Sequence, residues 1–343
     1  MPEFMGWVKR VDTGISQQIQ GMITDNGVVN NQQQIAAALS EQVSNAPANE
    51  PSVSVPFEPN SKSIKSDTLL MLKDATSGFK RPNILDVKLG RVLCGDYAKE
   101  DKRKRLADIA KATTHDEYGF RIAGMRVFHG ALSKNEDYDH NDSKDAKDPS
   151  KYISYNDESG YKIYNREYGK QLHVDDIRDS FRDFMFDGNA GVTEDLGKAI
   201  CSAFVKELEN VQDVLTRMPV RMFSSSLLFV FEGDGDALED AIEKNNETVD
   251  LIAEVDDVTK PRYPTALRTD SGIVLNDDEY LDDEVSSELG ERFNALPPMY
   301  SVKLIDFAHA TWIPNEAPDE NTMLGVRTLI DIFGELAEKG LEK

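Results

Sequence analysis

Residues 82–90, Pro-Asn-Ile-Leu-Asp-Val-Lys-Leu-Gly, constrain the fold and chemistry of this chain more than any other segment. Apolar and charged residues alternate within it, and residues two apart on a strand point to the same face. Asp86 and Lys88 are therefore predicted to point into one site, while the apolar residues around them face a core. A core does not need an acid beside a base, so this strand is expected to form part of a functional site. An edge-strand salt bridge is the alternative.

The overall composition excludes several classes of protein. The chain has 343 residues, a formal net charge of −23 and only two cysteines, Cys94 and Cys201. No run of 18 apolar residues is present, so no membrane span is expected. The cysteine contexts do not suggest a disulfide framework, which suits a reducing compartment. The acidic balance argues against direct binding of nucleic acid.

Hydrophobic patterning along the chain predicts an α+β fold. Amphipathic helices are expected from Thr193 to Pro219 and over residues 321–337, because apolar side chains recur there at helical spacing. Strands are expected within residues 67–93, 118–128, 223–231 and 299–307. Strands and helices in this mixed order indicate an α+β architecture with a helical lobe.

A basic helix is expected over residues 96–112. Between residues 88 and 126, ten Lys and Arg residues stand against six Asp and Glu residues, in an otherwise strongly acidic protein. A charge run is usually a solvated face. Because this one directly follows the strand with Asp86 and Lys88, we interpret it as a phosphate-binding helix.

Two further segments join this pattern. Ser224-Ser225-Ser226 enters an apolar strand, and Asp306 ends another, followed three residues later by His309. Each segment alone is a weak signal, since serine runs are common in turns and an Ile-Asp-Phe triplet arises often by chance.

Taken in order, the three segments P-x-x-x-D-x-K-x-G, S-S-L-L and I-D-F resemble the signature of the inositol polyphosphate kinase family. Residues 67–336 are covered by this resemblance. Gly78-Phe79, Gly119-Phe120 and Gly124-Met125 extend it toward the fungal multikinase branch.

The resemblance implies a two-lobed kinase fold similar to protein kinases and ATP-grasp enzymes. Residues 76–343 would form the C-terminal lobe. Residues 1–75 would be a remnant of an N-terminal lobe that we expect to be incomplete, with a disordered linker over 24–66. Nineteen acidic against four basic residues over 232–290 lead us to expect a disordered acidic insertion over 232–298.

The resemblance also assigns roles at a nucleotide site that uses ATP and Mg²⁺. Asp306 matches the catalytic aspartate that binds the metal, and hard cations prefer such carboxylate oxygens. Asp86 matches the residue that holds the ribose, and Ser226 is expected near the metal or the phosphates. Leu72 and Asp74 match the segment that binds the adenine of the nucleotide.

The substrate side is expected to be basic, because clustered Arg and Lys residues bind phosphates. Lys88 matches a catalytic lysine between the transferred phosphate and the substrate. Only one face of the basic helix can reach a ligand, so two or three of its candidates are expected to contact the substrate. The candidate substrate-binding residues are Lys88, Lys102, Arg103, Arg105, Lys170 and His309.

The resemblance implies an ATP-dependent multikinase that phosphorylates inositol 1,4,5-trisphosphate and inositol tetrakisphosphate, at the 3- and 6-positions, in nucleus and cytoplasm. An inositol hexakisphosphate kinase is the nearest alternative, because the motifs are shared. A non-catalytic scaffold is another, with the acidic tract binding transcription-regulatory proteins. A protein kinase is a poor third, since the chain has no H-R-D loop and no D-F-G.

Overall fold

The computed structural model describes residues 4–9, 68–131, 148–259, 267–268, 272–273, 296–314 and 317–342. The chain divides into two compact units, Pro2–Asp74 and Ala75–Lys343. In the first unit, β1 (Phe4–Lys9) pairs antiparallel with β2 (Thr68–Leu72). The linker expected over 24–66 lies outside the described residues.

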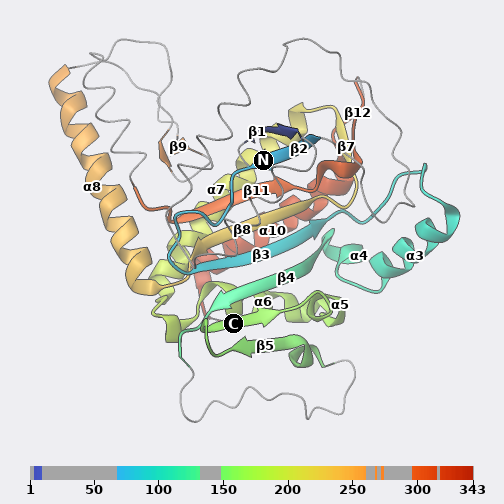
Figure 1. Ribbon diagram of the computed structural model, residues 1–343, viewed down its shortest axis with the longest axis horizontal. Helices are drawn as coiled ribbons and strands as arrows, with labels where there is room; N and C mark the ends of the chain where they lie inside the picture. The colour runs from blue at the N-terminus through green and yellow to red at the C-terminus, as the bar shows by residue number, and fades with distance from the viewer. Residues whose placement is uncertain are drawn as a thin grey trace. The chain divides into compact units, whose positions relative to one another are not determined.

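A six-stranded antiparallel sheet organises the second unit, in the order β11-β8-β3-β4-β6-β5 (Figure 1). Among the described residues, β7 pairs with β12 and β9 pairs with β10, each in a separate two-stranded sheet. The strands of the main sheet are β3 (Pro82–Leu89), β4 (Phe120–Phe128), β5 (Ile153–Asn156), β6 (Tyr161–Tyr164), β8 (Ser226–Glu232) and β11 (Tyr300–Ile305). The short strands are β7 (Val220–Met222), β9 (Leu267–Arg268), β10 (Gly272–Ile273) and β12 (Ala310–Trp312).

Helices connect and cover these strands, which confirms the predicted α+β class. Thr193 caps the long helix α7 by accepting a hydrogen bond from the Leu196 amide, and α7 ends just before Pro219, since proline cannot continue a helix. The α-helices of this unit are α3 (Glu100–Lys111), α4 (His115–Tyr118), α5 (Tyr168–Gln171), α6 (Ile177–Met185), α7 (Glu194–Arg217), α8 (Gly235–Thr259) and α10 (Glu320–Lys339).

The core lies between the sheet and helices α7 and α10. Strand β3 alternates as predicted, with Leu85 and Val87 fully buried. Phe204 of α7 and Phe333 of α10 pack against each other and against Phe229 of β8, with ring centroids 5.1–5.2 Å apart. These aromatic contacts pack one face of the sheet against helices α7 and α10.

The expectation of a disordered insertion over 232–298 is wrong for its first part. Glu232 ends β8, is buried, and accepts hydrogen bonds from the backbone amides of Lys80 (2.6 Å) and Arg81 (2.9 Å). Residues 235–259 form α8, which buries Leu238 and Ala241. The charge count concealed a helical period, because the acidic residues of α8 up to Glu247 lie on its exposed side.

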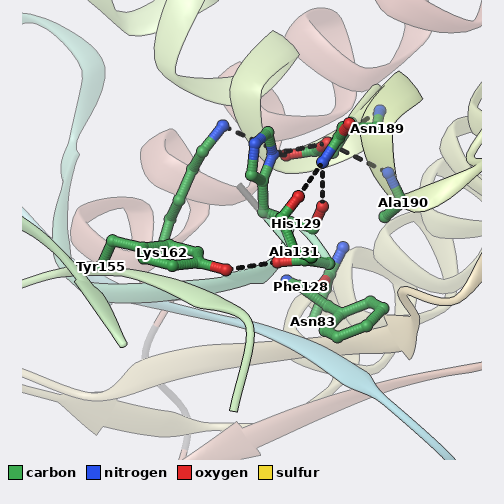
Figure 2. A network of polar contacts seen from close by, with 10 residues as sticks. Asn83, Phe128, His129, Ala131, Tyr155, Lys162, Asn189 and Ala190 are labelled. Atoms are coloured by element: carbon green, nitrogen blue, oxygen red, sulfur yellow. Dashed lines mark hydrogen bonds and ion pairs between the residues drawn. The ribbon is translucent and has the colours of Figure 1, made fainter. Parts of the chain in front are cut away.

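A buried polar network lies at the C-terminal end of β4. Asp187, in the connection between α6 and α7, accepts hydrogen bonds from Nδ1 of His129 (2.7 Å) and Nζ of Lys162 (3.3 Å) (Figure 2). It also accepts bonds from the backbone amides of Asn189 and Ala190. Because the carboxylate is paired on every side, the network ties the sheet to the helical layer.

Both cysteines are free thiols; Cys201 is buried, which raises the pKa of its thiol. Within the described part of the chain, no helix combines the length and apolar character that a membrane span requires.

Two helical glycines give opposite predictions for stability. A Cβ on Gly169 of α5 would lie 1.9 Å from the carbonyl oxygen of Ile122, whereas a Cβ on Gly334 of α10 would meet no atom within 4 Å. Gly169→Ala is expected to lower the free energy of unfolding by about 1–3 kcal/mol, the usual cost of overpacking. Gly334→Ala is expected to raise it by about 0.5–1 kcal/mol, because alanine loses less backbone entropy. Urea denaturation of the two variants checks both signs, and equal effects would contradict the packing of α5 on β4.

Candidate active site

Three neighbouring strands bring the predicted site residues to one end of the sheet. Ser226 at the start of β8 pairs in register with Lys88 of β3 on one side and with Ile305 of β11 on the other. Asp306, directly after β11, therefore lies beside both. Nζ of Lys88 is 3.2 Å from Oδ2 of Asp306, and Oγ of Ser226 donates to the same oxygen at 3.4 Å.

The backbone bends sharply on both sides of this contact. Ser224 and Asp306, with φ of 56° and 66°, are the non-glycine residues of the described chain with positive φ. Such conformations cost on the order of 1–3 kcal/mol and cluster at functional sites. The bend at Ser224 lets its carbonyl oxygen accept a hydrogen bond from Nζ of Lys88 at 3.0 Å, while its Oγ donates to the carbonyl of Leu93 at 2.8 Å. Lys88 is thus held between a carbonyl and a carboxylate.

Asp86 lies on the same face of β3, as the alternation predicted. Burial raises the pKa of its carboxyl, and the neighbouring Ser226 hydroxyl and the charge of Lys88 offset part of that rise. Its Oδ1 is buried and has no hydrogen-bond partner among the described residues. A buried acceptor without a donor suits a ligand that carries hydroxyl groups, as a ribose does.

Arg121 of β4 belongs to the site although the sequence did not single it out. It pairs in register with Lys88 and is buried, and its Nη1 donates to the carbonyls of Ile122 (3.0 Å) and Arg166 (3.4 Å). Burial lowers the pKa of Arg121, and the negative charge of Asp86 offsets part of that fall. The sequence could indicate only that Arg121 lies within a predicted strand. The pairing register of β3 and β4, which places Arg121 opposite Lys88, comes from the structure.

Lys170 lies on α5, which packs on β4 next to Arg121. Gly169 sits against the backbone of Ile122, and the carbonyl of Arg166 accepts the bond from Arg121. The Lys170 ammonium pairs with Glu167 at 2.8 Å. Its role in substrate binding stays a prediction.

His309, in the turn after Asp306, lies near enough to Lys102 in the first turn of α3 for the lysine charge to act on its imidazole. The hydroxyl of Tyr97, in the loop before α3, lies 2.9 Å from Nδ1 of His309. Burial lowers the pKa of His309, and the positive charge of Lys102 lowers it further. The structure therefore joins the first turn of the basic helix to the turn after Asp306.

The other basic candidates on α3 point in different directions. Arg103 forms an ion pair with Asp96 at 3.4 Å. Arg105 lines a shallow hollow on the helix together with Lys104 and Asp108. Lys102 and Arg105 are three apart and can share one side of the helix, whereas Arg103 is turned away from Lys102. Their contacts with substrate stay predictions.

Leu72 and Asp74 belong to the first unit, Pro2–Asp74. The contacts around Lys88 and Asp306 involve only the second unit, so the assignment of Leu72 and Asp74 to adenine binding stays a prediction.

The residues present fit a divalent cation that is bound by one protein carboxylate and mainly by phosphate oxygens of a nucleotide. No group of three or more His, Cys, Asp or Glu side chains gathers around one point in the described residues. Asp306 is about half exposed, and both of its side-chain contacts with Lys88 and Ser226 use Oδ2. Mg²⁺ is commonly bound by one or two carboxylates, with substrate phosphates and water completing its shell.

Comparison with known proteins identifies the family of this chain. A family model described as inositol polyphosphate kinase matches residues 69–334. The inositol polyphosphate multikinase of Saccharomyces cerevisiae is 31% identical over 294 residues, which cover 79% of this chain and 69% of that protein. Human inositol hexakisphosphate kinase 1 is 23% identical over 291 residues, which cover 81% of this chain and 55% of that protein.

A solved structure supports the same conclusion. The crystal structure of the S. cerevisiae inositol phosphate multikinase in complex with ADP and Mn²⁺ matches with a TM-score of 0.54 and 26% identity. The match covers 79% of this chain and 84% of that one. The predicted fold and family are confirmed: the chain belongs to the inositol polyphosphate kinase family.

Proposed function

We propose that this protein is an ATP-dependent multikinase that phosphorylates inositol 1,4,5-trisphosphate and inositol tetrakisphosphate at the 3- and 6-positions of the ring. One observation supports it above the others: Lys88 lies at the end of β3, bonded to Asp306, with Ser226 bonded to the same carboxylate. Phosphoryl transfer needs positioning and charge neutralisation more than covalent chemistry, and this cluster supplies both.

The nucleotide half of the proposed site consists of Asp86, Ser226 and Asp306. The unpaired Oδ1 of Asp86 would accept from ribose hydroxyls. Asp306, with Ser226 beside it, would hold Mg²⁺, which supplies charge neutralisation at the nucleotide phosphates when bound. The related multikinase structure in complex with ADP and Mn²⁺ supports a nucleotide and a divalent metal as the ligands.

Lys88 would act as a fixed positive charge at the transferred phosphoryl group. Its ammonium has three donors, and two are used by Asp306 and the Ser224 carbonyl. The third is available for a phosphate oxygen. Because the two protein contacts fix the position of the nitrogen, little side-chain freedom is lost when substrate binds.

The substrate half would be lined by basic groups on three sides. Lys102 lies in the first turn of α3, His309 lies in the turn after Asp306, and Arg121 lies beside Lys88. Lys170 on α5 and Arg105 on α3 would add further positive charge. A ring with several phosphates needs such distributed charge, since each phosphate requires its own donors.

Two alternatives concern the same chain. Its relatives include inositol hexakisphosphate kinases, so a diphosphate-forming activity is the nearest competitor. A non-catalytic scaffold that binds transcription-regulatory proteins through the acidic tract is the other. That partner class and the location in nucleus and cytoplasm stay predictions.

Phosphate transfer from ATP tests the proposal directly. The chain would be incubated with Mg²⁺ and ATP, and separately with inositol 1,4,5-trisphosphate, inositol tetrakisphosphate and inositol hexakisphosphate. We expect the first two to be phosphorylated, with ³¹P NMR placing new phosphates at the 3- and 6-positions, and a chelator to abolish turnover. Turnover of the hexakisphosphate alone would favour the diphosphate-forming kinase. Absence of both transfer and nucleotide binding would favour the scaffold.

Asp306→Asn is expected to lower kcat by about 100-fold or more, because loss of a metal ligand removes several kcal/mol of charge stabilisation. Asp213→Asn is the matched control, since Asp213 is an exposed residue paired with Arg217 on α7 and such pairs contribute little. Steady-state kinetics of both variants checks the assignment. Equal activity of the two variants would contradict the role of Asp306.

Asp86→Asn is expected to weaken ATP binding while stabilising the fold at neutral pH. Burial raises the pKa of Asp86, so between the unfolded and folded pKa values the folded state binds more protons. The carboxyl therefore destabilises the fold increasingly as pH rises through its folded pKa, and asparagine removes that charge. Melting temperatures at pH 4 and pH 7 check the sign. We expect the variant to gain on the parent protein as pH rises; a relative loss would contradict the burial argument.

A further inference from the structure

Tyr97 and His309 meet through one polar contact between two segments that are far apart in sequence. The Tyr97 hydroxyl lies 2.9 Å from Nδ1 of His309, and the ring centroids are 5.9 Å apart. Tyr97 is 65% exposed, so packing alone does not fix its ring. The hydrogen bond is therefore what orients these two side chains relative to each other.

The chemistry of the two groups determines which one donates. Although most of the Tyr97 ring is exposed, partial desolvation of its hydroxyl raises its pKa and Cys94 adds to the rise, so its phenol keeps its proton. Burial and Lys102 lower the pKa of His309, so at neutral pH its imidazole has one N–H. An imidazole nitrogen is a more basic acceptor than a phenol oxygen, which favours Tyr97 as the donor and Nδ1 as the acceptor. The imidazole proton then resides on Nε2.

We propose that Tyr97 is a positioning residue, whose hydroxyl holds His309 in the Nε2–H tautomer so that a neutral imidazole donates to a phosphate oxygen of the substrate. This rests on the proposed kinase function. The opposite tautomer would present the Nε2 lone pair to an anion. Lys102 beside His309 and Asp306 three residues before it place that donor among the groups proposed to bind phosphate.

Tyr97→Phe removes only the hydroxyl and tests the proposal by kinetics. We expect KM for inositol 1,4,5-trisphosphate to rise about fivefold to tenfold, within the usual range for one lost hydrogen bond between neutral groups, while kcat and KM for ATP change less than about twofold. Tyr155→Phe is the matched control, because its hydroxyl donates to the carbonyl of Gly130 at the other end of the sheet (Figure 2). In a His309→Gln background, Tyr97→Phe is expected to have no further effect on KM.

Histidine ¹⁵N NMR of the substrate-free protein reads the tautomer itself. The His309 signals are assigned by their loss in His309→Gln. We expect a protonated Nε2 and an unprotonated Nδ1 in the parent protein, and a mixture of tautomers in Tyr97→Phe. An Nδ1–H tautomer in the parent, or an unchanged tautomer in Tyr97→Phe, would overturn the proposal.

The kinetic and NMR experiments distinguish failure of the positioning role of Tyr97 from failure of the proposed kinase function. If the parent transfers phosphate but Tyr97→Phe leaves KM unchanged, the positioning role is wrong and the kinase assignment stands. If the parent transfers no phosphate, the kinase proposal fails, and the phosphate-donor role of His309 fails with it whatever tautomer NMR finds.

Discussion

The ion pair between Lys88 and Asp306 is the contact on which the site depends. It joins β3 to the residue after β11 across the intervening strand β8. It forms only if both neighbours pair with Ser226 in the observed register, because a slip of one residue would turn Lys88 into the core. Sheet register, turn geometry and the placement of charge are therefore parts of one requirement.

The same site lowers the stability of the fold. Asp86 is a partly buried carboxyl with an unpaired oxygen, and Ser224 and Asp306 adopt left-handed backbone conformations. Each is unfavourable in isolation. The aromatic packing of Phe204 and Phe333 behind the sheet offsets these costs. A strained backbone conformation persists only when the surrounding structure fixes it, and the packed core fixes the ends of these strands.

Sequence reasoning succeeded where the signal is local. The alternation around Asp86 and Lys88 predicted a strand with one polar face, and short motifs in order identified the family. The sequence-based predictions failed where contacts join distant parts of the chain, and where a high density of acidic residues obscures the helical spacing of apolar ones. Arg121 and Tyr97 join the site through strand register and a loop contact that no spacing reveals. Residues 235–259 are acidic enough to suggest disorder, yet every third or fourth position in the first turns of α8 is apolar and buried.

The most direct test of the central claim is a calorimetric titration of ADP, with and without Mn²⁺, into the parent protein and into Asp306→Asn. If the ends of β3, β8 and β11 form a nucleotide and metal site, Mn²⁺ will strengthen ADP binding at a single site in the parent and have little effect in the variant. Metal-dependent ADP binding that survives Asp306→Asn would contradict the account, because the metal would then be held elsewhere.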